Sequence, residues 1–188
     1  MLLMQMPLGI DENIIDVDGT MVETWRMHGD PGRIEELKPV PGVDVFMKLN
    51  PQVNTLLSRT KSTERYQLDK VRRFGLLERF EQTNGGGGMF VCDEDEQKKG
   101  HLENLVKRFS VMHPHSDLRN IAVIGNNCKC ELKFGIDLGV TVIRMRQKED
   151  PHAENDLIGL HHEVADWFGV MRLPFFEPHF REVLARRA

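Results

Sequence analysis

The segment Asp16-Val17-Asp18-Gly19-Thr20 brings together residue types that could handle a phosphate group. Two carboxylates two residues apart, at the end of a buried strand, repel each other unless a cation lies between them. Gly19 allows the backbone to turn sharply, and the hydroxyl of Thr20 can donate a hydrogen bond to a phosphate oxygen. The segment therefore favours a site that binds a divalent cation and a phosphate.

Two other interpretations of this segment are a calcium-binding loop and an ordinary turn. An EF-hand loop needs Gly at its sixth position and Glu at its twelfth, whereas counting from Asp16 gives Met21 and Met27. The spacing therefore argues against a calcium loop of that kind. A solvated Asp-Gly turn after a strand stays open, because a short motif also arises by chance.

Polar residues also follow or precede other predicted elements. Ser58, followed by Arg59, comes directly after the predicted strand 53–57, so its hydroxyl could hold a phosphate oxygen. Lys99, in the pair Lys98-Lys99, begins a predicted helix and could neutralise an anion or hold the nucleophile in place. Taken singly, Ser58 fits an ordinary turn and Lys99 fits a solvated surface lysine.

The predicted strand 121–124 ends at Gly125 and is followed by Asn126 and, further on, by Glu131. Amide and carboxylate oxygens at such a point could complete a metal site. Each of these later signals is weak by itself. Their order along the chain and their placement at successive strand ends make chance a poor explanation.

Apolar segments alternate with helical patterns along most of the chain. The predicted strands are 13–17, 53–57, 80–83, 121–124 and 140–143, with 89–92 as an additional strand, and the predicted helices are 43–49, 62–74, 99–109, 130–138 and 155–168. This alternation predicts a parallel sheet, and the continuous apolar runs predict that helices cover both of its faces. Chemistry is then expected at the carboxyl ends of the strands.

The domain organisation expected from this pattern is a single domain over residues 1–188. Its core would span residues 10–168, and residues 169–188 would form a C-terminal extension of unknown role. The length suffices for a full hydrophobic core. The segment 84–88 is glycine-rich and is expected to be a loop at the rim of the site.

Composition narrows the classes of function. The formal net charge is −4 with 29% charged residues, which argues against a specific nucleic-acid partner. There is no apolar run of about 20 residues, so no membrane association is expected. The three cysteines form no evident disulfide framework, and a cytoplasmic location is the expectation.

These motifs resemble those of the haloacid-dehalogenase-like superfamily, especially its phosphatases. Residues 16–20 look like its DxDGT motif, Ser58 like the hydroxyl of the second motif, and Lys99 like the lysine of the third. Residues 125–131 look like the fourth motif, which usually reads GDxxxxD in members with this spacing. The resemblance covers roughly residues 10–168.

The resemblance implies a Rossmann-like three-layer sandwich with a central parallel sheet of order 5-4-1-2-3. Members of the family often carry a cap domain, but the stretches 20–41 and 83–99 are short for a folded domain, so no large cap domain is expected. Asp16 would be the nucleophile that takes the phosphoryl group, and Asp18 would act as general acid and then as general base. The other implied residues are those that bind phosphate (Gly19, Thr20, Ser58, Arg59 and Lys99) and those that bind Mg²⁺ (Asp16, Asp18, Asn126 and Glu131).

The function expected from the resemblance is a Mg²⁺-dependent phosphomonoester hydrolase. Its substrate would be a phosphorylated small molecule or a phosphorylated macromolecule, and the sequence leaves a homo-oligomer open. One departure supports an alternative: Asn126 stands where the family has an acid, so it brings no charge to the metal. A non-catalytic or weakly active binding or regulatory relative is therefore the second hypothesis.

Overall fold

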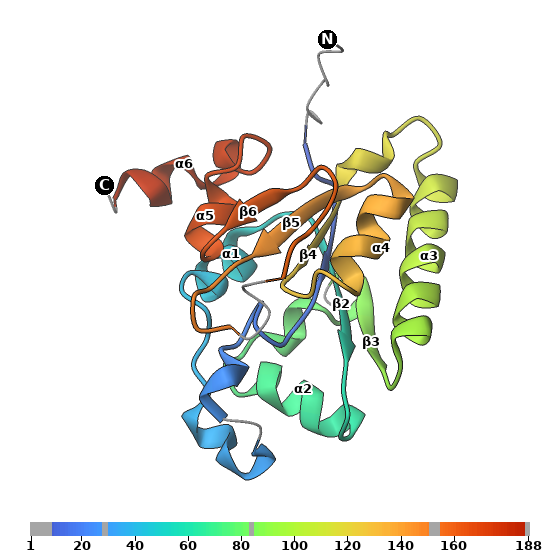
Figure 1. Cartoon of the computed structure of the whole chain (residues 1–188). Helices are drawn as coiled ribbons and strands as arrows, with labels where there is room; N and C mark the ends of the chain where they lie inside the picture. Colours follow the sequence, from blue (N-terminus) through green and yellow to red (C-terminus); the bar gives the residue numbers. More distant parts are fainter. Residues whose placement is uncertain (1–8, 28–29, 83–84, 151–154, 187–188) are drawn as a thin grey trace.

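The computed structural model of the chain describes residues 9–27, 30–82, 85–150 and 155–186 (Figure 1). In these residues six strands form one sheet, and every neighbouring pair of strands runs parallel. The strands are β1 (Glu12–Ile15), β2 (Val53–Arg59), β3 (Gly88–Cys92), β4 (Ile121–Gly125), β5 (Thr141–Met145) and β6 (His162–Val164). The predicted α/β class with a central parallel sheet is confirmed.

The strand order across the sheet is β3-β2-β1-β4-β5-β6. This differs from the order 5-4-1-2-3 implied by the resemblance. Taken from the opposite edge, five of the strands follow the implied sequence, but the sheet continues past β5 with a sixth strand. β6 is only three residues long and is not fully buried, so it lacks the apolar run by which a strand is predicted.

Helices cover both faces of the sheet, as Figure 1 shows. On one face lie α3 (Asp95–Met112) and α4 (Glu131–Leu138). On the other lie α1 (Val43–Leu49), α2 (Glu64–Arg72), α5 (Trp167–Met171) and α6 (Glu177–Ala185). None of the helices in the described residues is both long enough and apolar enough to cross a membrane.

Successive side chains of the central strand enter different hydrophobic clusters. Ile14 packs in the cluster beneath α3 and α4, whereas Ile15 packs in the cluster beneath α1, α5 and α6. Successive residues of a strand point to opposite faces, so one apolar run supplies both cores. β1 pairs with β2 on one side and with β4 on the other, which fixes the residues after it at the middle of the sheet edge.

The described residues also contain short 3₁₀ helices. Two of them, Thr24–Met27 and Pro31–Glu36, lie between β1 and α1 and form a small insertion. Further 3₁₀ helices in the described residues are Leu77–Arg79 before β3 and Leu118–Asn120 before β4.

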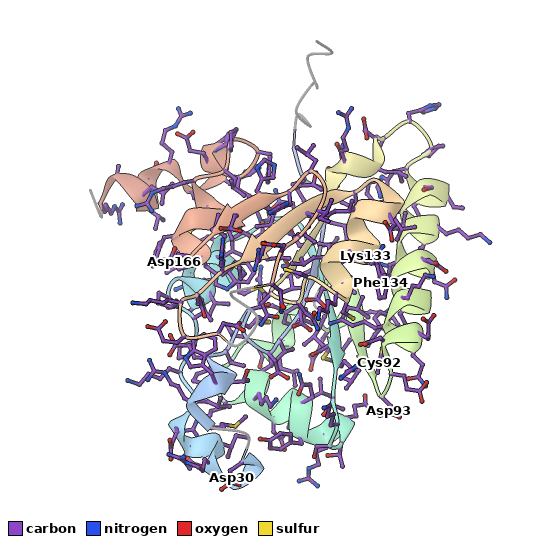
Figure 2. All side chains as sticks on the ribbon, viewed as in Figure 1. Asp30, Cys92, Asp93, Lys133, Phe134 and Asp166 are labelled. Carbon is purple, nitrogen blue, oxygen red and sulfur yellow. The ribbon has the colours of Figure 1, made fainter. Side chains whose placement is uncertain are left out.

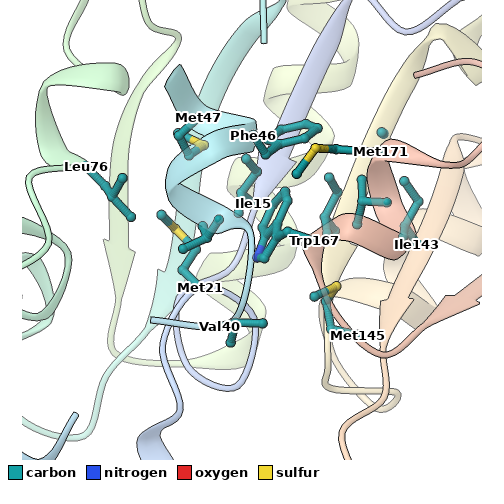
Figure 3. Close-up of a cluster of buried hydrophobic side chains, with 14 of the residues drawn as sticks. Ile15, Met21, Val40, Phe46, Met47, Leu76, Ile143, Met145, Trp167 and Met171 are labelled. Atoms are coloured by element: carbon teal, nitrogen blue, oxygen red, sulfur yellow. The ribbon is translucent and has the colours of Figure 1, made fainter. Parts of the chain in front are cut away.

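The C-terminal residues form part of the core. The ring of Phe46 on α1 lies 4.7 Å from the indole of Trp167 and 5.3 Å from the rings of both Phe176 and Phe180, centroid to centroid. All four side chains are fully buried, and Figure 3 shows Trp167 against Phe46 in this cluster. The tail that the sequence left unassigned therefore packs as α5 and α6 on α1.

Two predicted elements are wrong. The helix over 155–168 is absent from its described residues; β6 and the first residues of α5 lie there instead, because Asp166 caps a new helix by accepting a hydrogen bond from the Gly169 amide. The strand over 80–83 is likewise absent from residues 80–82, where the Phe80 carbonyl closes a turn to the Gly88 amide. The edge strand is β3. Of the predicted loop 84–88, residue 84 lies outside the described residues.

Candidate functional site

A cavity of about 550 Å³ opens at the carboxyl ends of the strands. Asp16 and Asp18 line it after β1, Thr60 after β2, Asn126 after β4 and Asp150 after β5. Cys92 and Asp93, labelled in Figure 2, mark the end of β3 at the same edge. The predicted position of the site, at the carboxyl edge of a parallel sheet, is the position of this cavity.

Asp16 is buried at this edge and shares a lysine with Glu131. The Lys98 ammonium lies 2.8 Å from an oxygen of Asp16 and 2.8 Å from an oxygen of Glu131, and all three side chains are at most 7% exposed. Lys98 occupies the face of α3 that also buries Leu102. Two buried carboxylates therefore depend on one cation.

The surroundings shift the pKa values of both Asp16 and Lys98. Burial raises the pKa of Asp16 to about 7, and the carboxylates of Glu131 and Asp18 add to that rise against the effect of Lys98. Burial acts to lower the pKa of Lys98, but Asp16 and Glu131 outweigh it and raise that pKa above its ordinary value. The negative charge at Asp16 is therefore only partly compensated by the protein.

The carboxylate of Asp18 is hydrogen-bonded to side chains of α2. Lys70 donates to one of its oxygens at 2.7 Å, and the Gln67 amide donates to the other at 3.1 Å. Lys70 and Gln67 lie on the buried face of α2, which Thr63 caps by accepting from the Tyr66 amide. Their spacing of three residues puts both on that face. The side chain of Asp18 is 37% exposed, so it borders the cavity with one side held.

Gly19 has the backbone conformation that the turn requires, but Thr20 does not reach the cavity. Gly19 has φ +68°, and this left-handed conformation costs a residue with a Cβ roughly 1–2 kcal/mol. Thr20 is fully buried, its carbonyl accepts from the Trp167 indole at 2.8 Å, and its hydroxyl has no hydrogen-bond partner among the described residues. The expected contact of the Thr20 hydroxyl with phosphate is not supported by this position.

Ser58 is not at the cavity either. Its side chain is fully buried, and its hydroxyl accepts from the Gln67 amide at 2.7 Å. β2 extends to Arg59, two residues beyond the predicted end of the strand, so the hydroxyl at the cavity belongs to Thr60. The sequence Ser58-Arg59-Thr60 offers a hydroxyl at both 58 and 60. Only the position at which the strand ends decides which of the two reaches the cavity.

Lys99, which was also predicted to bind phosphate, does not reach the cavity either. Its ammonium lies 5.9 Å from the ring centroid of Phe134 on α4 and does not line the cavity, whereas its neighbour Lys98 does (Figure 2 labels Phe134). The predicted helix began at Lys99, but α3 begins at Asp95. In that longer helix Lys98 precedes the buried Leu102 by one turn, which is the signal that would have identified it.

The fourth predicted motif, residues 125–131, borders the cavity and contacts Asp150, which was not predicted. The Asn126 amide donates to a carboxylate oxygen of Asp150 at 2.6 Å, and both side chains are buried. The Glu131 carboxylate accepts a hydrogen bond from the main-chain amide of Asn127 at 3.0 Å, in addition to its contact with Lys98. No motif in the sequence points to Asp150, which lies in the connection after β5.

The rim of the cavity carries aromatic and basic residues. Trp25 and Met27, from the insertion after β1, face it together with Tyr66 of α2. Arg59 lines it too, with its guanidinium 2.8 Å from the carboxylate of Asp95. Arg59 therefore lies where its predicted contact with phosphate would require, although it already has an acidic neighbour.

The donors at this edge suit a hard divalent cation in kind. Asp16, Asn126 and Asp150, which all carry side-chain oxygens, line one cavity, and Mg²⁺ is usually held by one or two carboxylates with water and substrate phosphate. In the described part of the chain no three His, Cys, Asp or Glu side chains are clustered as a preformed metal cage. The residues thus fit an ion that keeps several waters.

Solved structures share this fold. The chain is similar to an uncharacterized protein from Listeria monocytogenes serotype 4b, with a TM-score of 0.62 and 13% identity over 94% of this chain and 99% of that chain. It is similar to YfnB, a candidate HAD-hydrolase of Bacillus subtilis crystallised with magnesium, with a TM-score of 0.61 and 10% identity over 87% and 97%. A haloacid dehalogenase-like family hydrolase from Xanthomonas campestris gives 0.60 and 11% over 92% and 99%.

The chain therefore has the fold of the haloacid-dehalogenase-like hydrolases, as the motifs predicted. A scan against protein-family models and a search of the curated proteins find no match. At identities this low the likeness concerns the fold, so the chemistry has to be argued from the side chains of the cavity.

Proposed function

We propose that the chain is a phosphomonoester hydrolase that transfers the phosphoryl group to Asp16. The observation that carries this proposal is the pair of carboxylates at the cavity: Asp16 is buried and held by Lys98 at 2.8 Å, and Asp18 borders the opening, 37% exposed. One carboxylate is thus fixed for attack, while the other is accessible for proton transfer. The substrate is a phosphorylated small molecule or a phosphorylated macromolecule.

In the first step an oxygen of Asp16 attacks phosphorus. A bond forms between Asp16 and phosphorus while the bond from phosphorus to the leaving oxygen breaks, and Asp18 gives that oxygen a proton. Lys98 keeps Asp16 in place and offsets part of the negative charge that gathers as the phosphate approaches.

In the second step water hydrolyses the aspartyl-phosphate. Asp18, now without its proton, takes one from the water, whose oxygen attacks phosphorus and releases Asp16 and inorganic phosphate. Lys70 and Gln67 hold the Asp18 carboxylate from the side of α2 in both steps.

Magnesium is the cofactor that we assign to this site. Asp16, the Asp18 main-chain carbonyl and Asn126 would hold it, and it would offset the charge of the phosphate that meets Asp16. Glu131, the remaining predicted ligand, is engaged with Lys98 and with the Asn127 amide. We therefore give Glu131 the role of positioning Lys98 rather than that of a ligand.

The test is hydrolysis of p-nitrophenyl phosphate and of a panel of phosphorylated metabolites in the presence of Mg²⁺. We expect turnover by the native chain and none above background by Asp16→Asn, because the side-chain amide cannot attack phosphorus to form the acyl phosphate. Trapping of a covalent phosphate by mass spectrometry after an acid quench checks the intermediate. Equal turnover by the two proteins would remove Asp16 from the mechanism.

Asp137→Asn is the matched control for this experiment. Asp137 lies on α4, is exposed, and pairs with Lys133 four residues earlier. Its substitution removes one carboxylate from the protein without touching the cavity. Activity should stay within about twofold of the native value, since surface changes of this kind are usually close to neutral.

The alternative function is that of a non-catalytic or weakly active binding or regulatory protein. The observation that favours it is Asn126, an uncharged side chain at a position where the resemblance expects an acid. Such a protein would bind phosphorylated compounds without releasing phosphate. Equilibrium dialysis with a radiolabelled phosphorylated metabolite panel, combined with the turnover assay, separates a binder from an enzyme.

A further inference from the structure

We propose that Asp150 supplies the carboxylate that this site lacks at Asn126, so that Asp16 and Asp150 together hold the divalent cation. This inference rests on the proposed magnesium-dependent hydrolase. It assigns a metal ligand to the connection after β5, outside the four motifs that the sequence predicted.

The position of Asp150 is the first argument. Its carboxylate lies 2.6 Å from the Asn126 amide nitrogen, and both side chains line the same cavity as Asp16. Asp150 is 4% exposed and follows β5, whose carboxyl end lies beside that of β4. Two neighbouring strands thus deliver an amide and a carboxylate to one point.

Gly19 shows how closely these two side chains approach the loop after β1. A methyl group on Gly19 would come within 2.1 Å of the Asn126 amide nitrogen and within 2.4 Å of an Asp150 oxygen. Asp150 therefore packs directly on the residue that follows Asp18. This places its carboxylate beside the part of the backbone that we expect to face the ion.

The charges at the site form the second argument. Asp16 and Glu131 bring two negative charges and Lys98 brings one positive charge, which leaves one negative charge for an ion. Asn126 adds none. With Asp150 the site offers two negative charges to a dication, the balance that an acid at position 126 would have given.

The chemistry of the amide forms the third argument. The contact between Asn126 and Asp150 requires the amide nitrogen to face the carboxylate, because two oxygen acceptors cannot share a hydrogen bond. The other atom of that amide is an oxygen, which is a suitable Mg²⁺ donor. The hydrogen bond therefore orients Asn126 as a neutral ligand while Asp150 carries the charge.

The experiment measures Mg²⁺ binding by isothermal titration calorimetry, without substrate and without reference to turnover. Four proteins are compared: the native chain, Asp150→Asn, Asn126→Ala, and the exchange variant Asn126→Asp/Asp150→Asn. Circular dichroism and thermal unfolding check that each is folded. Asp137→Asn again serves as the control that removes an acid elsewhere.

We expect Asp150→Asn to weaken Mg²⁺ binding by at least about tenfold, because even residues that only support metal ligands are worth about 10–100-fold. Asn126→Ala should lose less than Asp150→Asn, since it removes a neutral donor. The exchange variant should regain most of the native affinity, because it returns the carboxylate to position 126. Mn²⁺ binding followed by electron paramagnetic resonance should give the same order.

Several outcomes would overturn the assignment. Native affinity in Asp150→Asn, a greater loss in Asn126→Ala, or an exchange variant as weak as Asp150→Asn would each contradict it. A native chain that binds no Mg²⁺ would instead remove the magnesium from the proposed function. A native chain that binds Mg²⁺ but hydrolyses nothing would leave Asp150 as a ligand and remove the hydrolase.

Discussion

The ammonium of Lys70 lies 2.7 Å from the carboxylate of Asp18, although the two residues are 52 positions apart in the chain. Lys70 is itself 5% exposed and also donates to the side-chain amide oxygen of Gln67 at 2.9 Å. A buried lysine needs such partners, because an isolated charge is costly to remove from water. α2 thus serves as a support for the residue that we propose as the general acid.

Lys70→Met should lower kcat by about tenfold, a fraction of the about 10²–10⁴-fold that a general acid contributes in full. The physical reason is that Asp18 loses the contact that holds it beside the leaving oxygen. The loss should be greater for alkyl phosphates than for p-nitrophenyl phosphate, because a basic leaving group depends more on the proton. Steady-state kinetics with both substrates measure this difference.

Arg65→Gln is the control for Lys70→Met. Arg65 lies on the same helix with its side chain 90% exposed, so it should leave kcat unchanged for both substrates. If Lys70→Met lost the same factor with both substrates, Lys70 would act on the site in general and not through Asp18.

Lys98→Met should destabilise the fold by about 3–5 kcal/mol, the usual cost of breaking a buried ion pair. The variant leaves the carboxylates of Asp16 and Glu131 buried without their shared cation. Urea unfolding followed by circular dichroism measures the change. The double variant Lys98→Met/Glu131→Leu should recover part of the loss, and a double variant no more stable than the single one would contradict this reading.

Phe180→Ala should lower the free energy of unfolding by about 3–5 kcal/mol, as expected for removal of a buried aromatic ring. Phe180 is fully buried and stacks on Phe46 at a centroid distance of 5.3 Å. Thermal or urea unfolding provides the measurement. Arg181→Ala, one residue further on an exposed face, should change stability by less than about 0.5 kcal/mol.

His162 provides a prediction about pH. Burial, together with the nearby His161, lowers the pKa of His162 below 6.5. The unfolded chain then binds a proton more readily than the folded chain, so the free energy of unfolding decreases as the pH falls below about 6.5. Above that pH both states are neutral at His162 and the contribution vanishes.

His162→Phe should remove this part of the pH dependence while keeping a ring against Phe175, which lies 5.2 Å away. Urea unfolding at about pH 7.5 and about pH 5.5 brackets the ordinary histidine range. The native chain should lose more stability between them than the variant. His115→Gln, at an exposed position, should lose as much as the native chain; a variant His162→Phe that does the same would contradict the prediction.

The sequence predicted the class of fold and the edge of the sheet at which chemistry is placed, because buried parallel strands have a clear apolar pattern. It placed Asp16 and Asp18 at that edge, where the structure has them. The errors at Ser58 and Lys99 come from element boundaries, since β2 is longer than predicted and α3 begins four residues earlier. A shift of one or two residues decides which side chain reaches a cavity.

Asp150 and Lys70 were missed for a different reason. Asp150 lies in a connection between strands, where sequence gives no periodic pattern from which to place a side chain. Lys70 reads as one of several charged residues of a helix, and only the packing of α2 on the sheet turns it toward Asp18. Tertiary contacts between distant segments decide both positions.

The hydrogen bond from the Trp167 indole to the Thr20 carbonyl spans 147 residues. During synthesis the loop that carries the proposed nucleophile emerges early, whereas the indole that fixes it follows only after all six strands of the described sheet have been made. Contacts of such separation form late, because a long segment must first be ordered. A ribosome-bound chain that stops before residue 167 should therefore have the central strands but a loose loop around Asp16, and the proposed phosphatase activity should arise only after α5 has docked.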